Sequence, residues 1–147
     1  FFYLTPFFSV KLFQDKTDFN LNQIAAAHFD GEGEKFVSID LDDYRKFVST
    51  RQIVRSSNIV VKKGDLQSVI PSVRKSYARN IHASEFFVSI RLKEGIPCNY
   101  EEVLNLLQTI QSGSASDGTS LQWGLTINAR MEEDVQVLIL AGERVEE

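Results

Sequence analysis

Three aspartates lie within four residues of the sequence, in the segment SIDLDDY at positions 38–44. The residues that follow have helical spacing, so Asp40, Asp42 and Asp43 are expected at a helix start. Three kinds of chemistry fit carboxylates in this place. They could cap the helix by accepting hydrogen bonds from its first N–H groups, bind Mg²⁺ or Ca²⁺ through oxygen ligands, or orient water for attack on a substrate brought by another molecule.

The residues alone favour helix capping. Asp42 or Asp43 suits a cap position, and a carboxylate near a helix start is stabilised by the positive end of the helix dipole by about 0.3–1 kcal/mol. The ligand loop of a calcium site contains a glycine that allows its sharp turn, and this segment has no glycine. A small Mg²⁺-dependent enzyme using Asp40, Asp42 and Asp43 stays a further alternative.

Other catalytic patterns have little support. His28 and His82 are isolated from other candidate catalytic residues, and Cys98 follows Pro97 in an expected turn. Each is more typical of a structural residue than of a nucleophile or its base. The eight glycines are dispersed and form no phosphate-binding loop. We therefore expect this chain not to bind a nucleotide by itself.

The composition is that of one globular domain with a substantial core, with 147 residues, 43% hydrophobic and 24% charged. A net charge of −4 argues against nucleic acid and anionic membranes as partners, and no apolar run is long enough for membrane insertion. A single cysteine excludes an internal disulfide and fits a reducing cytoplasm. Because the sequence does not begin with methionine, we expect a trimmed piece of a longer protein.

Hydrophobic periodicity predicts helices and strands along most of the chain. Residues 1–14 are aromatic and indicate a strand that is broken or bent near Pro6. Asn99 with Glu102 forms a capping pair at a helix start. Pro71 is expected to kink a helix or to lie at its first position. Further helices are expected at 19–29, after Asp43, at 65–80 and after Asn99. Strands are expected at 53–61, 85–92, 121–128 and 135–142. Residues 30–35 are expected to form a turn, and residues 112–120 a polar loop.

The order of these elements predicts an α+β fold, a small mixed sheet with helices packed on one face. The strands at 85–92 and 121–128 flank the helix after Asn99, so they should be parallel neighbours. The last strand, 135–142, is nearly all apolar, as a central strand would be, and is expected to form an antiparallel hairpin with 121–128. The inward-facing residues of that partner are expected to be Trp123, Leu125 and Ile127.

Three segments together resemble the second, C-terminal domain of the FtsZ/tubulin superfamily. SIDLDDY is similar to the family's catalytic loop, Asn-x-Asp-Phe-x-Asp-Val, with Asp40 and Asp43 in the places of its two acids and Ser38 where Asn is usual. Residues 85–110 resemble the family's strand, glycine turn and helix, and residues 121–143 resemble its final hairpin. The family's Gly-rich GTP signature is absent from this sequence.

The resemblance implies a cytoskeletal, filament-forming protein, with residues 1–36 a remnant of a GTPase domain and residues 37–147 the second domain. In such filaments one subunit binds GTP, and loop acids of the next subunit complete the site and position the attacking water. Asp40 would be the leading acid and Asp43 its companion. GTP, with Mg²⁺, would be held by a neighbouring subunit, either a second copy or an FtsZ/tubulin-like partner in the cytoplasm.

The sequence leaves one alternative from a different class. Without a nucleotide-binding motif, the chain holds at most half of a GTPase site. It could instead be a non-catalytic interaction module of the same fold, which binds itself or a filament through a sheet edge or a helix face.

Overall fold

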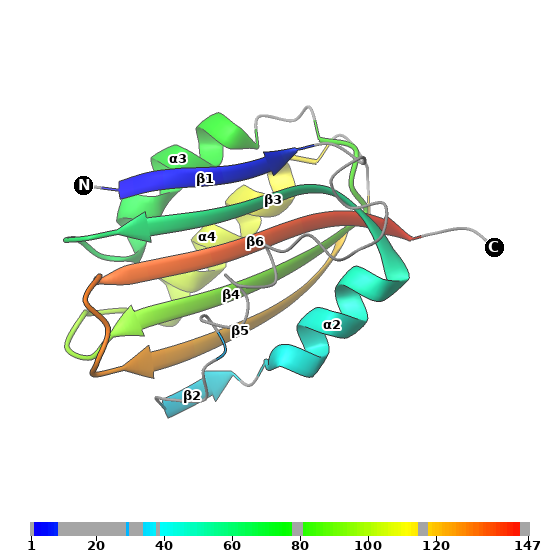
Figure 1. The fold of residues 1–147 in the computed structure, drawn as a ribbon. Coiled ribbons are helices and arrows are strands. Elements are labelled where there is room, and N and C mark those ends of the chain that lie inside the picture. The colour runs from blue at the N-terminus through cyan, green and yellow to red at the C-terminus, as the bar shows by residue number, and fades with distance from the viewer. Residues whose placement is uncertain are drawn as a thin grey trace.

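A computed structural model describes residues 2–8, 29, 34–37, 39–77, 81–114 and 118–144, with the backbone alone at 2–8 and 34–37. The strands are β1 (Phe2–Phe8), β2 (Glu34–Val37), β3 (Arg51–Val61), β4 (Glu85–Lys93), β5 (Ser120–Asn128) and β6 (Val135–Arg144). The helices are α2 (Leu41–Thr50), the 3₁₀ helix η2 (Leu66–Val69), α3 (Ile70–Ser76) and α4 (Tyr100–Ser112). All the strands belong to one six-stranded sheet in the order β1-β3-β6-β4-β5-β2 (Figure 1).

Most predicted elements are present. The four strands expected from residue 53 onward correspond to β3, β4, β5 and β6, and the helix expected after Asp43 begins at Leu41. Glu34 and Lys35, expected in a turn, belong to strand β2 instead. No helix in the described part of the chain has both the length and the apolar composition to cross a membrane. Outside the described residues lie most of the helix expected at 19–29, residues 30–33, Ser38 and residues 115–117 of the polar loop.

The predicted hairpin of the last two strands is wrong. β6 pairs antiparallel with β3 on one side and with β4 on the other, so β4 separates β6 from β5. Between Val135 and Gly142, all residues of β6 except Gln136 are buried. A strand that is apolar on both faces is best buried between two other strands and beneath helices. The composition of β6 thus predicts its central place but not its neighbours.

The predicted strand–helix–strand unit is confirmed. β4 and β5 are parallel neighbours, and α4 connects them. α4 begins at a capping box in which Asn99 Oδ1 accepts from Glu102 N at 2.9 Å and Glu102 Oε1 accepts from Asn99 N at 3.3 Å. Pro71 lies in the first turn of α3, where its missing N–H costs no intrahelical hydrogen bond.

Helices cover both faces of the sheet (Figure 1). The α+β class and the mixed sheet are as predicted, with α3 and α4 packed over the larger core on one face. α2 differs from the prediction because it packs on the opposite face, against Phe87, Leu138 and Leu140. Successive side chains of a strand point to opposite faces, so apolar residues on the second face of β4 and β6 need a cover of their own.

β1 and β2 are the two edge strands of the sheet. β1 pairs antiparallel with β3 and runs unbroken through Pro6, which lies opposite Ser57. Proline is tolerated on an edge strand because one side of the strand makes no ladder hydrogen bonds. β2 pairs antiparallel with β5. The division of the chain at residue 36 into two parts stays a prediction.

Candidate functional site

The aspartates of the acidic segment lie at the start of α2. Asp40 is the N-cap residue: its Oδ1 accepts a hydrogen bond from Asp43 N at 3.0 Å, and Asp43 Oδ2 accepts one from Asp40 N at 2.9 Å. This reciprocal pair satisfies two backbone N–H groups that the helix leaves without partners. The capping interpretation is therefore confirmed, with Asp40 rather than Asp42 or Asp43 at the cap position.

The acidic helix start is open to contact by another molecule. Asp40 is exposed, Asp43 is half-buried, and the Asp42 side chain is 89% exposed. Asp42 forms an ion pair with Arg45 at 3.6 Å, which contributes little to stability because both groups face solvent. Asp40 and Asp43, the two acids that match the family's loop, are thus the two whose positions the capping box fixes.

Aromatic packing holds α2 on the sheet. Ile39, Tyr44 and Phe47 are buried, and the ring of Phe87 in β4 packs against the aromatic residues of the helix. Its centroid is 6.4 Å from that of Tyr44 and 5.6 Å from that of Phe47, within the range of favourable aromatic pairs. The place of Asp40 is therefore set by the core beneath α2 as well as by its own hydrogen bonds.

A metal site formed by this chain alone has no support in the described residues. Among them, no group of three His, Cys, Asp or Glu side chains is arranged to hold an ion. The aspartates at 40, 42 and 43 therefore do not converge as a ligand set. The described residues therefore do not support the alternative of a Mg²⁺-dependent enzyme that uses these aspartates.

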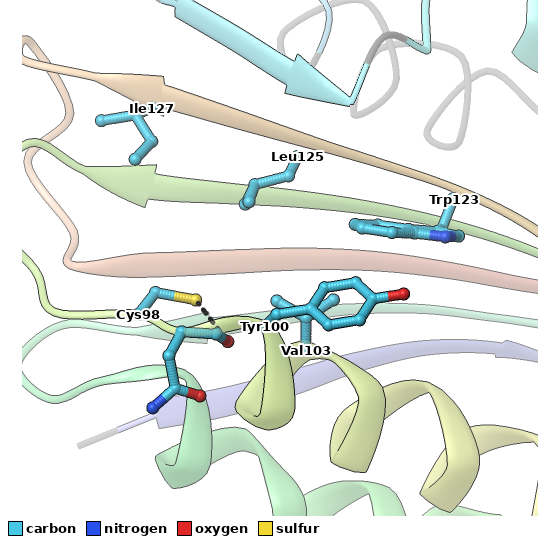
Figure 2. A pocket seen from close by; sticks show the side chains of 7 residues that line it. Cys98, Tyr100, Val103, Trp123, Leu125 and Ile127 are labelled. Atoms are coloured by element: carbon cyan, nitrogen blue, oxygen red, sulfur yellow. Dashed lines mark hydrogen bonds between the residues drawn. The ribbon is translucent and has the colours of Figure 1, made fainter.

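An apolar groove lies between the start of α4 and β5 (Figure 2). Trp123, Leu125 and Ile127 point into it from β5, and Tyr100 and Cys98 border it on the helix side. The prediction that these three β5 residues face the core holds only in part. They contact the core from one side, but α4 does not extend over them fully, and each is only half-buried. Because its lining is almost entirely apolar, the groove is unsuited to a nucleotide phosphate.

A second cleft, the cationic cleft, lies at the opposite end of α2 from the aspartates. Lys46, Thr50, Arg51 and Arg144 line it, with a volume of about 300 Å³. Arg51 Nη2 donates to Glu85 Oε1 at 2.6 Å, and Arg144 Nε donates to Glu85 Oε2 at 3.0 Å. Local sequence patterns do not reveal this cluster, because residues 51, 85 and 144 come together only through the strand order β3-β6-β4.

Acidification is expected to destabilise the fold through Glu85. The hydrogen bond from Arg51 lowers the pKa of Glu85 below its usual 4.5, against the opposing effect of burial, and the charges of Arg51 and Arg144 add to the lowering. A carboxyl group whose pKa is lowered in the folded state stabilises the fold at pH values above its usual pKa. This stabilisation is lost as the pH falls through the folded-state pKa. Glu85→Gln should lower the free energy of unfolding by about 1.5–3 kcal/mol at neutral pH.

Urea unfolding of the wild type and of Glu85→Gln across the acid range measures this effect. The difference in unfolding free energy should be full above pH 4.5 and shrink below it. A difference that stays constant with pH would show that the Glu85 charge does not stabilise the fold.

Comparison with known proteins assigns the fold. No protein-family model and no curated protein matches the sequence. The structure is similar to an empty FtsZ dimer from M. jannaschii, with a TM-score of 0.52, 16% identity, and coverage of 74% of this chain and 32% of that chain. TubZ from Bacillus thuringiensis serovar israelensis is similar in two filament structures. The GDP-form protofilaments give a TM-score of 0.55 and 17% identity, with coverage of 75% of this chain and 30% of that chain. The GTPγS-form protofilament gives a TM-score of 0.61 and 17% identity, with coverage of 89% of this chain and 35% of that chain.

These matches define an FtsZ/tubulin-like fold. The chain spans about a third of the length of each of these proteins, and the identities are low. The similarity therefore establishes the fold, as the sequence resemblance predicts. In the described part of the chain, Asp40 and Asp43 lie at an exposed helix start within this fold.

Proposed function

We propose that this chain is the second-domain part of a filament-forming subunit of the FtsZ/tubulin type, and that Asp40 and Asp43 activate hydrolysis of GTP bound by the adjacent subunit. The observation that carries the proposal is the exposed, capped start of α2, where the two acids are held at fixed positions in an FtsZ/tubulin-like fold. The solved relatives support the filament part of the proposal, since they are a dimer and protofilaments.

The role of the two acids follows from carboxylate chemistry. A carboxylate that accepts a hydrogen bond from water orients the lone pair of the water oxygen toward phosphorus. It also stabilises the positive charge that develops on the water as the attack proceeds. In the proposed arrangement Asp40 binds this water, and Asp43 fixes Asp40 through the capping box. Hydrolysis then requires assembly, because the acids and the nucleotide belong to different subunits.

Mg²⁺ would supply charge neutralisation on the phosphates in this arrangement. The described residues offer no set of three ligands for it. Its ligands would therefore come mainly from GTP and the adjacent subunit, and this chain's contribution would be limited to the acids at the start of α2.

The dependence of hydrolysis on assembly tests the proposal. Phosphate release and light scattering are measured together on the natural protein that carries these residues, with GTP, over a wide range of protein concentration. We expect phosphate release per subunit to rise with concentration and to follow assembly, because a head-to-tail contact completes each site. Constant release per subunit, or assembly without release, would contradict a site shared between subunits.

A second candidate function is a non-catalytic module that binds a second copy of itself. The observation that favours it is the edge position of β1, whose outer side is not paired with any described strand. An open strand edge is a template for pairing with another chain. This candidate predicts self-association without GTP that Asp40→Asn leaves unchanged, which the same light-scattering experiment measures.

A further inference from the structure

We infer that the cationic cleft binds the phosphate group of a small phosphate monoester. This site is separate from the acidic helix start, and the inference does not depend on the proposed function.

The cleft concentrates positive charge. Arg51 and Arg144 are directly opposite in the antiparallel pair of β3 and β6, an arrangement that is destabilising for two like charges. Glu85 pairs with both arginines, and Lys46 adds a third cation at the rim. Among the residues that the structure describes, three cations against one carboxylate leave two positive charges unbalanced, which matches the charge of a phosphate monoester at neutral pH. Glu143 precedes Arg144 in β6, so its side chain points to the other face of the sheet.

The Arg51 guanidinium is already held in place. Its Nη1 donates to Thr50 Oγ1 at 2.7 Å, its Nη2 donates to Glu85, and its cation lies 4.7 Å from the centroid of the Phe47 ring. Because these contacts already hold the guanidinium of a residue that lines the cleft, an oxyanion would bind there without the cost of ordering this side chain.

The C-terminal end of α2 is the negative pole of the helix and opposes an anion, so the cations that line the cleft must outweigh it. The cleft volume of about 300 Å³ is at the small end of the range for organic ligands. The site therefore has room for a phosphate with a short organic group attached.

Isothermal titration of the full chain with glycerol 3-phosphate, inorganic phosphate and glycerol tests the inference. We expect one binding event with glycerol 3-phosphate, weaker binding of inorganic phosphate and none of glycerol, with affinity that falls as salt is added. Lys46→Gln and Arg144→Gln should each weaken binding about tenfold or more, because each removes one charge-assisted contact. Lys63 is an exposed cation that follows the end of β3, at the opposite end of this strand from Arg51, so Lys63→Gln should have no effect.

Two results would overturn the inference: no binding of either phosphate at millimolar concentration, or binding that Lys46→Gln and Arg144→Gln leave unchanged. Binding only to vesicles of phosphatidylglycerol, with no free phosphate bound, would also overturn it and indicate a membrane surface. Both substituted side chains are largely exposed, and thermal unfolding of each variant confirms that the fold is intact. Arg51 is left unchanged because its partly buried side chain also supports Glu85.

Discussion

Replacing Asp40 by asparagine is expected to lower GTP hydrolysis in assemblies of the natural protein by about 100-fold or more, since a positioned acid or base contributes about that much. The substitution removes the negative charge but keeps a side-chain oxygen that can accept from Asp43 N. Asparagine caps a helix as well as aspartate does, so unfolding should change little. Asp43→Asn should give a smaller loss, because its proposed role is to fix Asp40 rather than to bind water. Phosphate release at saturating GTP measures both effects.

Asp42→Asn is the matched control. It removes one charge from the same helix turn, but the Asp42 side chain is 89% exposed and takes no part in the capping box. Asp40→Ala separates capping from catalysis, because it should cost about 1 kcal/mol of stability in addition to the loss of turnover. Equal turnover in the wild type, Asp40→Asn and Asp42→Asn would rule out a catalytic role for Asp40. An equal loss in Asp40→Asn and Asp42→Asn would indicate a general electrostatic effect instead.

Replacing Phe87 by alanine is expected to lower the free energy of unfolding by about 3–5 kcal/mol. The Phe87 side chain is fully buried, and its ring contacts those of Tyr44 and Phe47 across the interface between the sheet and α2. Its removal would leave a cavity beneath the helix whose first residues carry the candidate site. Urea unfolding followed by circular dichroism measures the loss.

Phe87→Leu provides the control, because leucine refills most of the volume and should cost clearly less than alanine. The comparison also separates stability from site position. If α2 is held by this packing, Phe87→Ala should weaken hydrolysis even under conditions where the chain stays folded. A cost below 1 kcal/mol for Phe87→Ala would show that α2 does not depend on this contact.

Local sequence signals predicted much of the fold. The capping pair at Asn99 and Glu102 located the start of α4 correctly, and alternation located β4 and β5. The acidic segment was placed correctly at the start of α2, although the cap is Asp40 and not its neighbours. These features depend on residues that are a few positions apart in the sequence. The regular repeats of helices and strands determine how such residues lie relative to one another.

The errors concern relations between distant segments. The apolar run of β6 indicates burial but cannot specify β3 and β4 as its neighbours. Trp123 alternates as a core residue would, yet it borders a groove because α4 does not cover it completely. Arg51 and Arg144 are 93 residues apart, 144 minus 51, and strand register alone places them opposite each other. Local periodicity carries no information about such pairings.

The central place of β6 has a consequence for how the protein is made. β3 and β4 leave the ribosome well before β6, yet in the finished sheet they meet only through it. Until that last described strand is synthesised, both expose unpaired edges, a condition in which nascent chains aggregate or recruit chaperones. Closure of the sheet therefore has to wait for the synthesis of β6, and a ribosome stalled before residue 135 would carry two unjoined halves.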